Sequence, residues 1–167
     1  MEQFRPMRRI RQQLPVKETE QILSEATSGV LSVIGDNGYP YGVPVSYVYA
    51  NGKIYFHSAL QGHKIDAIRA NPKVSLSVIA QDDIVPQKFT TYFRSVIAFG
   101  KARILEDDKE KMAALRLLAA RYSNSSVTEE MTEDEIGGGF NRLLMVEVEI
   151  EHLTGKEAIE LVRMRNG

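Results

Sequence analysis

The sequence contains no cysteine among its 167 residues. Disulfide bonds, thiolate nucleophiles and cysteine-ligated metal sites are therefore excluded. Three histidines remain as potential metal ligands, namely His57, His63 and His152. They do not follow a His-Glu-x-x-His spacing and no Asp/Glu triplet accompanies them, so we expect no metal site.

The sequence also lacks an excess of charge, because 21 Lys and Arg face 22 Asp and Glu, for a net charge of −1. Nucleic-acid and membrane surfaces are normally bound by a clustered basic excess. Only residues 7–11 are locally basic, and we interpret them as a solvated arm or one that docks on a second subunit. No stretch resembles a signal peptide or a membrane span. We therefore expect a cytoplasmic protein without a nucleic-acid or membrane partner.

The length of the chain suits one domain, residues 1–167, with one hydrophobic core. Alternating apolar residues predict about six strands. Residues 90–105 are long enough for two strands or for one bent strand, and in the second case Gly100 is the expected bend. Apolar stripes predict helices over 15–26, from 63 to about 70, and from 106 onward, whereas the acidic segment 123–139 ends in three glycines and is interpreted as a mobile surface excursion. The predicted strands cover residues 30–34, 41–49, 53–57, 73–80, 90–105 and 144–150.

Most of these strands are joined by turns, although residues 81–89 are expected to form a loop and 154–156 a turn that carries a cation. Turn-connected strands favour an antiparallel sheet. We therefore predict a mainly β fold, a small closed or nearly closed barrel with helices outside it. Pro44 removes a ladder donor from the second strand, so it is expected at an edge or at a bulge facing a ligand.

A strand, a loop and a short helix follow one another between Lys53 and Val74. Ser58 and the loop amides precede the first turn of this helix, where unpaired N–H groups favour a phosphate. His63 and Lys64 add donors at the same point, and His57 ends the strand. This cluster indicates an anion cradle. A half-buried structural His57 and a solvated helix start at residues 63 and 64 remain the alternatives.

The order of several short motifs resembles that of flavin-binding split-barrel proteins. The chain is most similar to the nitroimidazole-resistance branch of the pyridoxamine 5′-phosphate oxidase-like superfamily, over residues 8–162. The motifs are Tyr-x-Val-Pro-Val-Ser-Tyr at 41–47, Tyr-Phe-His-Ser at 55–58, Gly-His-Lys at 62–64, Tyr-Phe-Arg-Ser-Val at 92–96, Phe-Gly-Lys-Ala-Arg at 99–103 and Thr-Gly-Lys-Glu at 154–157.

The resemblance implies a six-stranded antiparallel split β-barrel that forms a homodimer, with FMN bound between the subunits. It implies that a strand segment lies along the isoalloxazine ring, namely Val43, Pro44, Val45 and Ser46. It implies that the phosphate side is held by His57, Ser58, His63 and Lys64, and that the flavin is also approached by Arg94 and Ser95. Position 63 is often arginine in relatives, and histidine there makes phosphate binding more dependent on pH.

The function implied by the resemblance is that of an FMN-dependent oxidoreductase that reduces small nitroaromatic compounds. His57 is the implied catalytic residue, because a histidine can donate a proton near neutral pH. The residues themselves agree with a flavin, which needs a phosphate cradle, an apolar slot and a few polar groups at its edge. A non-catalytic flavin-binding module and a haem-binding relative remain alternatives, because one fold hosts several functions.

Overall fold

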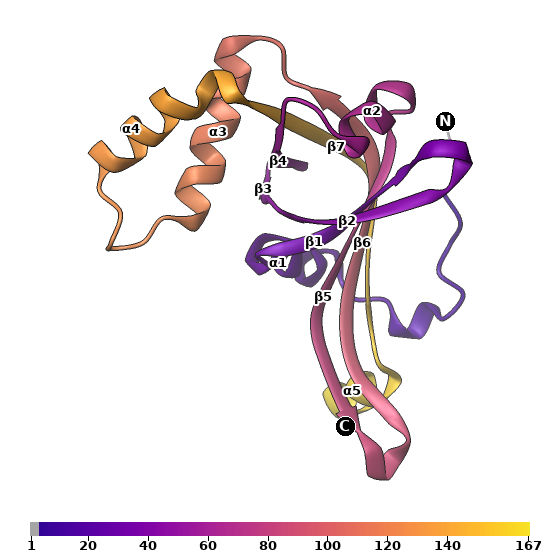
Figure 1. Ribbon diagram of the computed structural model, residues 1–167. Helices are drawn as coiled ribbons and strands as arrows, with labels where there is room; N and C mark the ends of the chain where they lie inside the picture. The colour runs from indigo at the N-terminus through magenta and orange to yellow at the C-terminus, as the bar shows by residue number, and fades with distance from the viewer. Residues whose placement is uncertain (1–3) are drawn as a thin grey trace.

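The computed structural model describes residues 4–167, which form one seven-stranded antiparallel sheet surrounded by helices (Figure 1). The mainly β prediction is therefore confirmed. The strands are β1 (Ser28–Ile34), β2 (Pro40–Ser46), β3 (Val48–Ala50), β4 (Lys53–Ala59), β5 (Lys73–Val85), β6 (Thr90–Ile104) and β7 (Leu143–Glu157). The α-helices are α1 (Val16–Glu25), α2 (His63–Ala70), α3 (Asp108–Tyr122), α4 (Glu129–Gly139) and α5 (Ile159–Asn166).

The order of the strands in the sheet is β2-β1-β5-β6-β7-β4-β3. The two edge strands, β2 and β3, are separated in the chain only by Tyr47, so the sheet curls until its edges meet there. Within residues 4–167 no ladder joins these two strands, and the sheet is not closed. The predicted number of six strands was wrong, and the predicted closure is not observed. Pro44 lies on the edge strand β2, as expected.

Tyr47 interrupts what the sequence predicts as one strand over residues 41–49. Its amide donates to the Tyr122 hydroxyl at 3.1 Å, and that hydroxyl lies 2.6 Å from the Tyr47 carbonyl oxygen. Its own phenol donates to the carbonyl of Leu23 at 2.6 Å, and the residue is only 1% exposed. Both backbone groups of Tyr47 are thus used by a side chain of α3, and the ladder ends on either side of it.

The hairpin of β5 and β6 projects from the body of the protein as a long arm (Figure 1). Residues 81–85 continue β5 and pair with residues 90–94, so the loop expected at 81–89 was wrong over most of its length. β6 is one strand, and its register against β7 shifts at Gly100, where the sequence predicts a bend. A Cβ atom on Gly100 would lie 2.2 Å from the Glu149 carbonyl oxygen, so the shift requires glycine.

β7 runs to Glu157, seven residues beyond the predicted end of this strand. The turn expected at 154–156 was wrong, because these residues pair with β6. Gly155 is covered by the start of α1, and a Cβ atom there would lie 2.4 Å from the Thr19 Oγ1. α1 therefore packs mainly on β7, with further contacts to β3 and β6.

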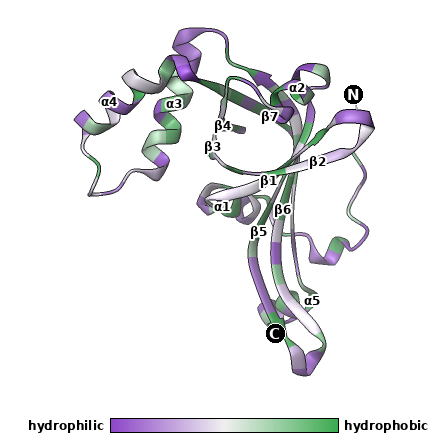
Figure 2. Ribbon diagram, in the orientation of Figure 1, coloured by the Kyte–Doolittle hydropathy of each residue, from purple (hydrophilic) through white to green (hydrophobic). Residues whose placement is uncertain are grey.

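The main core lies inside the curl of the sheet, between alternate residues of the strands and the helices α1 and α2. Figure 2 shows hydrophobic residues along the strands of the body and both hydrophilic and hydrophobic ones at the tip of the β5–β6 hairpin, where Phe89 is exposed. Burying one large apolar side chain stabilises a fold by about 1.5 to 3 kcal/mol. The most buried large side chains of this core include Phe56, Leu23, Leu31, Ile54, Ile65 and Leu76.

A second, smaller core lies under α3 and α4 at one end of the molecule. The surface excursion expected at 123–139 was wrong, because residues 129–139 form α4. Thr128 caps this helix by accepting a hydrogen bond from the Met131 amide at 3.1 Å. Ile136 is buried against Leu115 and Leu118, which holds the helix in place. Among residues 4–167 no helix is both long enough and apolar enough to cross a membrane.

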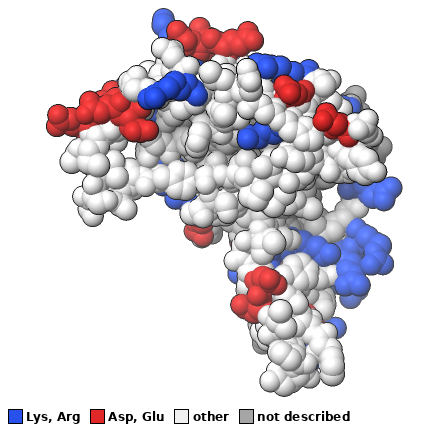
Figure 3. Space-filling model, in the orientation of Figure 1, with Lys and Arg blue, Asp and Glu red and all other residues white. Residues whose placement is uncertain are grey.

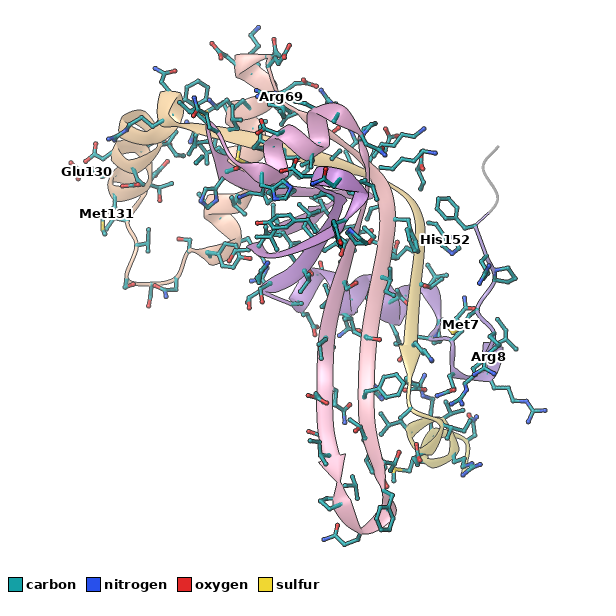
Figure 4. The ribbon with its side chains drawn as sticks, turned by 45° about the vertical axis from the view of Figure 1, so that its right-hand side comes forward. Met7, Arg8, Arg69, Glu130, Met131 and His152 are labelled. Carbon is teal, nitrogen blue, oxygen red and sulfur yellow. The ribbon has the colours of Figure 1, made fainter. Side chains whose placement is uncertain are left out.

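The N-terminal segment lies along β7 and α5, on the side that carries His152 (Figure 4). The Phe4 ring stacks on the His152 ring with 4.7 Å between centroids. Gln12 is buried in the 3-10 turn η1 (Ile10–Gln12) and donates to the Glu157 carbonyl at 2.9 Å. This segment is the basic arm seen in the sequence, and it packs on its own chain.

Candidate functional site

The strand β4 places its two candidate site residues on opposite faces, because successive side chains of a strand alternate. His57 is exposed and lines a cavity beneath α3 and α4. Ser58 is 4% exposed and faces the other way. Its Oγ is the one buried side-chain oxygen or nitrogen without a hydrogen-bond partner in the part of the chain described. An orphaned hydroxyl of this kind indicates a missing partner or a shift of the adjoining loop on binding.

The start of α2 has the features of an anion site. The N-cap residue Gly62 has φ 149°, and no side chain of residues 4–167 caps the helix. The amides of Ile65 and Asp66 donate to the Gly62 carbonyl, which leaves the amides of His63 and Lys64 for a ligand. The positive end of the helix dipole favours an anion there. Lys64 follows directly and makes no ion pair within residues 4–167. These features fit the phosphate group of a flavin.

His63 is turned toward the connection between β1 and β2. Its Nε2 accepts a hydrogen bond from the Asp36 amide at 3.2 Å, and its ring lies against Tyr41 with 4.2 Å between centroids. A Cβ atom on Gly35 would lie 2.9 Å from the same Nε2, so glycine makes room for the ring. In this arrangement His63 joins α2 to the β1–β2 connection, and Lys64 is left as the cation of the cradle.

The four candidate residues on β2 divide between the two faces of that strand. Val43 and Val45 point into the core, whereas Pro44 and Ser46 are exposed. An edge strand of this kind offers a ligand its outer face and its unpaired backbone groups.

Arg94 and Ser95 lie on the part of β6 that leads into the arm. Arg94 is opposite Glu157 on β7, whereas Ser58 is opposite Leu144 on the same strand. These two partners are 157 − 144 = 13 residues apart. At roughly 3.3 Å per residue the separation along β7 is about 40 Å, well beyond the length of one FMN molecule. The structure therefore does not bring Arg94 and Ser95 to the cradle of the same chain.

The cavity beside His57 has a volume of about 490 Å³ and lies between α3, α4, β4 and β7. Cavities of this size accommodate small molecules and cofactors. Most of its wall is apolar, and the polar groups are few. The lining residues are His57, Leu115, Leu118, Ala119, Tyr122, Ser123, Val127, Met131, Thr132, Glu135, Ile136, Gly139 and Leu143.

An ion-pair cluster lies on the same face of β4 as His57, beside Tyr55, which precedes His57 by two residues. The buried Glu147 carboxylate accepts from Arg103 Nε at 2.9 Å and lies 3.2 Å from Lys53 Nζ. Burial opposes its ionisation, but hydrogen bonds from Arg103, Lys53 and Tyr55 outweigh burial and lower the pKa of Glu147. Burial, together with the hydrogen bond to Glu147, raises the pKa of Tyr55 to about 12. Tyr55 is therefore protonated at neutral pH and is not a base for the neighbouring cavity.

Sequence reasoning missed the wall of this cavity that α4 supplies. Met131, Thr132 and Ile136 come from the segment interpreted as a surface excursion. A helix-start signal was present, because Thr128 is followed by Glu129 and Glu130, as at many helix N-termini. The three glycines at 137–139 argued against a helix, because glycine disfavours helix interiors. In the structure they form the end of α4.

A profile of the pyridoxamine 5′-phosphate oxidase family matches residues 15–157. The chain belongs to this family. Among solved structures, a candidate 5-nitroimidazole antibiotic resistance protein from Bacteroides thetaiotaomicron is 24% identical with a TM-score of 0.70, covering 87% of this chain and 86% of that chain. An FAD-binding protein from Mesorhizobium loti is 26% identical with a TM-score of 0.62, covering 87% and 96%. An FAD- and heme-binding protein from Mycobacterium smegmatis is 14% identical with a TM-score of 0.68, covering 93% and 80%.

These comparisons confirm the family that the sequence motifs suggested. No protein with a curated description matches the chain. The pyridoxamine 5′-phosphate oxidase family is associated with flavin-dependent oxidoreductases, which supports a flavin as the cofactor.

Proposed function

We propose that this member of the pyridoxamine 5′-phosphate oxidase family is an FMN-dependent oxidoreductase that reduces small nitroaromatic molecules. The observation that carries the proposal is the uncapped start of α2, with Lys64 beside it and the orphaned Ser58 hydroxyl just before the loop. His57 is next to Ser58 in β4, and its side chain lies on the opposite face of the strand. The cofactor supplies the electron transfer, and the protein binds, orients and protonates.

FMN is proposed rather than FAD because the cradle suits a terminal phosphate and the sequence has no dinucleotide-binding fingerprint. Ser58 reaches such a phosphate only if the loop 60–62 shifts, since its hydroxyl is buried. All three residues of that loop are exposed, so the shift disturbs no core packing.

The active form is proposed to be a homodimer with the flavin between two copies of the chain. Arg94 and Ser95 are too far from the cradle of their own chain, so they contact its flavin only if they come from a second copy. The outer face of the sheet supports this arrangement because it exposes large apolar side chains across β1, β5 and β6. These side chains are Val30, Ile34, Ile79, Ile97 and Phe99.

His57 is proposed to hold and deliver a proton to the substrate during reduction of a nitro group. It lies in the wall of a largely apolar cavity, where water competes less for its hydrogen bonds. The likeness to the candidate nitroimidazole-resistance protein from Bacteroides supports this substrate class.

Purified protein should be titrated with FMN, FAD and haem, and its absorbance and fluorescence recorded. Flavin bands and a one-to-one FMN complex with weak FAD binding are expected. Turnover of a 5-nitroimidazole by the FMN complex then separates an oxidoreductase from a non-catalytic flavin-binding module. A Soret band without flavin binding would instead favour a haem protein, which is the second candidate given the likeness to the Mycobacterium smegmatis protein.

A further inference from the structure

The cavity between α3, α4, β4 and β7 differs in charge from the start of α2. The described residues that line it include one carboxylate, Glu135, and one imidazole, His57, but no lysine or arginine. The cradle at α2 offers instead Lys64 and the positive end of a helix dipole. The two sites therefore favour ligand groups of opposite charge.

The surroundings of the cavity reinforce its negative character. Figure 3 shows acidic side chains gathered over the α4 end of the molecule. Glu133 is neutralised by a two-pronged ion pair with Arg116. The other acidic residues of α4, Glu129, Glu130, Asp134 and Glu135, make no ion pair among the described residues. Of these four carboxylates, Glu135 lines the cavity itself. Carboxylates at and near an apolar cavity repel an anion and attract a cation.

The walls of the cavity favour a flat ring. α3 contributes the Tyr122 ring and the side chains of Leu115 and Leu118, and α4 contributes Met131 and Ile136. The Tyr122 hydroxyl is already engaged with the backbone at Tyr47 and Thr27, so its ring is what the residue presents to a ligand. Aromatic faces and methionine sulfur pack well on aromatic ligands.

We propose that this cavity binds the substrate and selects planar aromatic molecules that are neutral or cationic over anionic ones. The proposal rests on the proposed function only for the role of His57 in turnover. The negative charge of the cavity disfavours the phosphate of FMN, so this phosphate belongs at the start of α2 and the substrate in the cavity.

The charge preference is tested by calorimetry on the full chain without added flavin. Three probes share one ring system: 2-naphthalenemethanol is neutral, 2-naphthylmethylammonium is cationic and 2-naphthoate is anionic. The first two are expected to bind at least about tenfold more tightly than 2-naphthoate, which corresponds to about 1.4 kcal/mol. Equal or tighter binding of 2-naphthoate overturns the proposal.

Two matched pairs of variants locate the binding. Glu135→Gln should reduce the ratio of the affinities for the cationic and anionic probes by at least about threefold. Glu130→Gln, at an exposed position on the same helix, should leave this ratio unchanged. Ala119→Phe fills the cavity and should abolish binding of all three probes, whereas Ala120→Phe, exposed on the same helix, should leave binding intact. Unchanged binding in both Glu135→Gln and a folded Ala119→Phe places the probes elsewhere and overturns the proposal.

Competition with FMN distinguishes this inference from the proposed function. FMN at saturating concentration should leave the affinity for 2-naphthalenemethanol within about twofold. Displacement of the probe by FMN would assign the cavity to the flavin ring and overturn the inference while the FMN proposal stands. If the wild-type protein binds the probes with the expected preference but binds no FMN, the proposed function fails and the cavity assignment stands.

Discussion

The Arg94 guanidinium donates from Nε to the Glu157 carboxylate at 3.2 Å, across β6 and β7. Glu157 is 3% exposed, and it also accepts from Arg165 at 2.8 Å. This buried carboxylate ties the base of the arm to α5. It also holds Arg94 far along β7 from Ser58, which is the observation behind the proposed dimer.

Ile97→Glu should convert the proposed dimer to a monomer and weaken FMN binding at the same time. Ile97 is exposed on the outer face of β6, and a carboxylate there is costly to bury in an apolar interface. Light scattering and a fluorescence titration measure the two effects. The control is Leu117→Glu, an exposed position on α3, which should change neither. A wild-type monomer that still binds FMN would show that the interface is not needed.

Lys64→Ala should raise the dissociation constant of FMN at least about tenfold. A hydrogen bond to a charged group contributes roughly 1.5 to 3 kcal/mol, and a tenfold change corresponds to about 1.4 kcal/mol. Arg69→Ala is the matched control, because Arg69 is an exposed cation in the last turn of the same helix (Figure 4). Quenching of flavin fluorescence measures both constants. Equal affinities for Lys64→Ala and wild type would remove Lys64 from the phosphate site.

His57→Ala should lower nitro-group reduction by a factor on the order of 10² to 10⁴, the range found for positioned proton donors. Because its side chain faces away from Ser58, FMN binding should stay within about threefold of wild type. Rates are compared at matched flavin occupancy, with His152→Ala as the control on β7. If His57→Ala turns over at the wild-type rate, water or the flavin itself delivers the proton.

Glu147→Gln should destabilise the fold at pH 7 by roughly 1.5 to 3 kcal/mol, because it removes the charge that Arg103 and Lys53 bind. The pKa of Glu147 is lowered in the folded protein, so its contribution is full above the unfolded value of about 4.5 and is lost as the pH falls through the folded value. Urea unfolding at several pH values measures this. The difference in free energy of unfolding between wild type and Glu147→Gln should shrink below about pH 4.5. Glu149→Gln, at an exposed position on the same strand, should unfold with the free energy of the wild type.

Local patterns in the sequence determined the parts of this protein that depend on neighbouring residues. The alternation over residues 53–57 predicted β4, because a half-buried strand needs one apolar face. Gly100 marked the shift in β6, since only glycine leaves room for the Glu149 carbonyl. Ser58, Gly62 and Lys64 indicated the strand, loop and helix start that the structure forms.

Contacts between distant segments decided the rest. The break at Tyr47 depends on the Tyr122 hydroxyl, 75 residues away, and His63 is oriented by Asp36, 27 residues away. α4 is held by burial of Ile136 against α3, so its glycine-rich, acidic sequence did not predict it. The periodicity of a sequence predicts which face of a segment is apolar, but it does not predict which other segment packs on that face. The cavity beside His57, and its position on the face of β4 opposite Ser58, therefore came only from the tertiary structure.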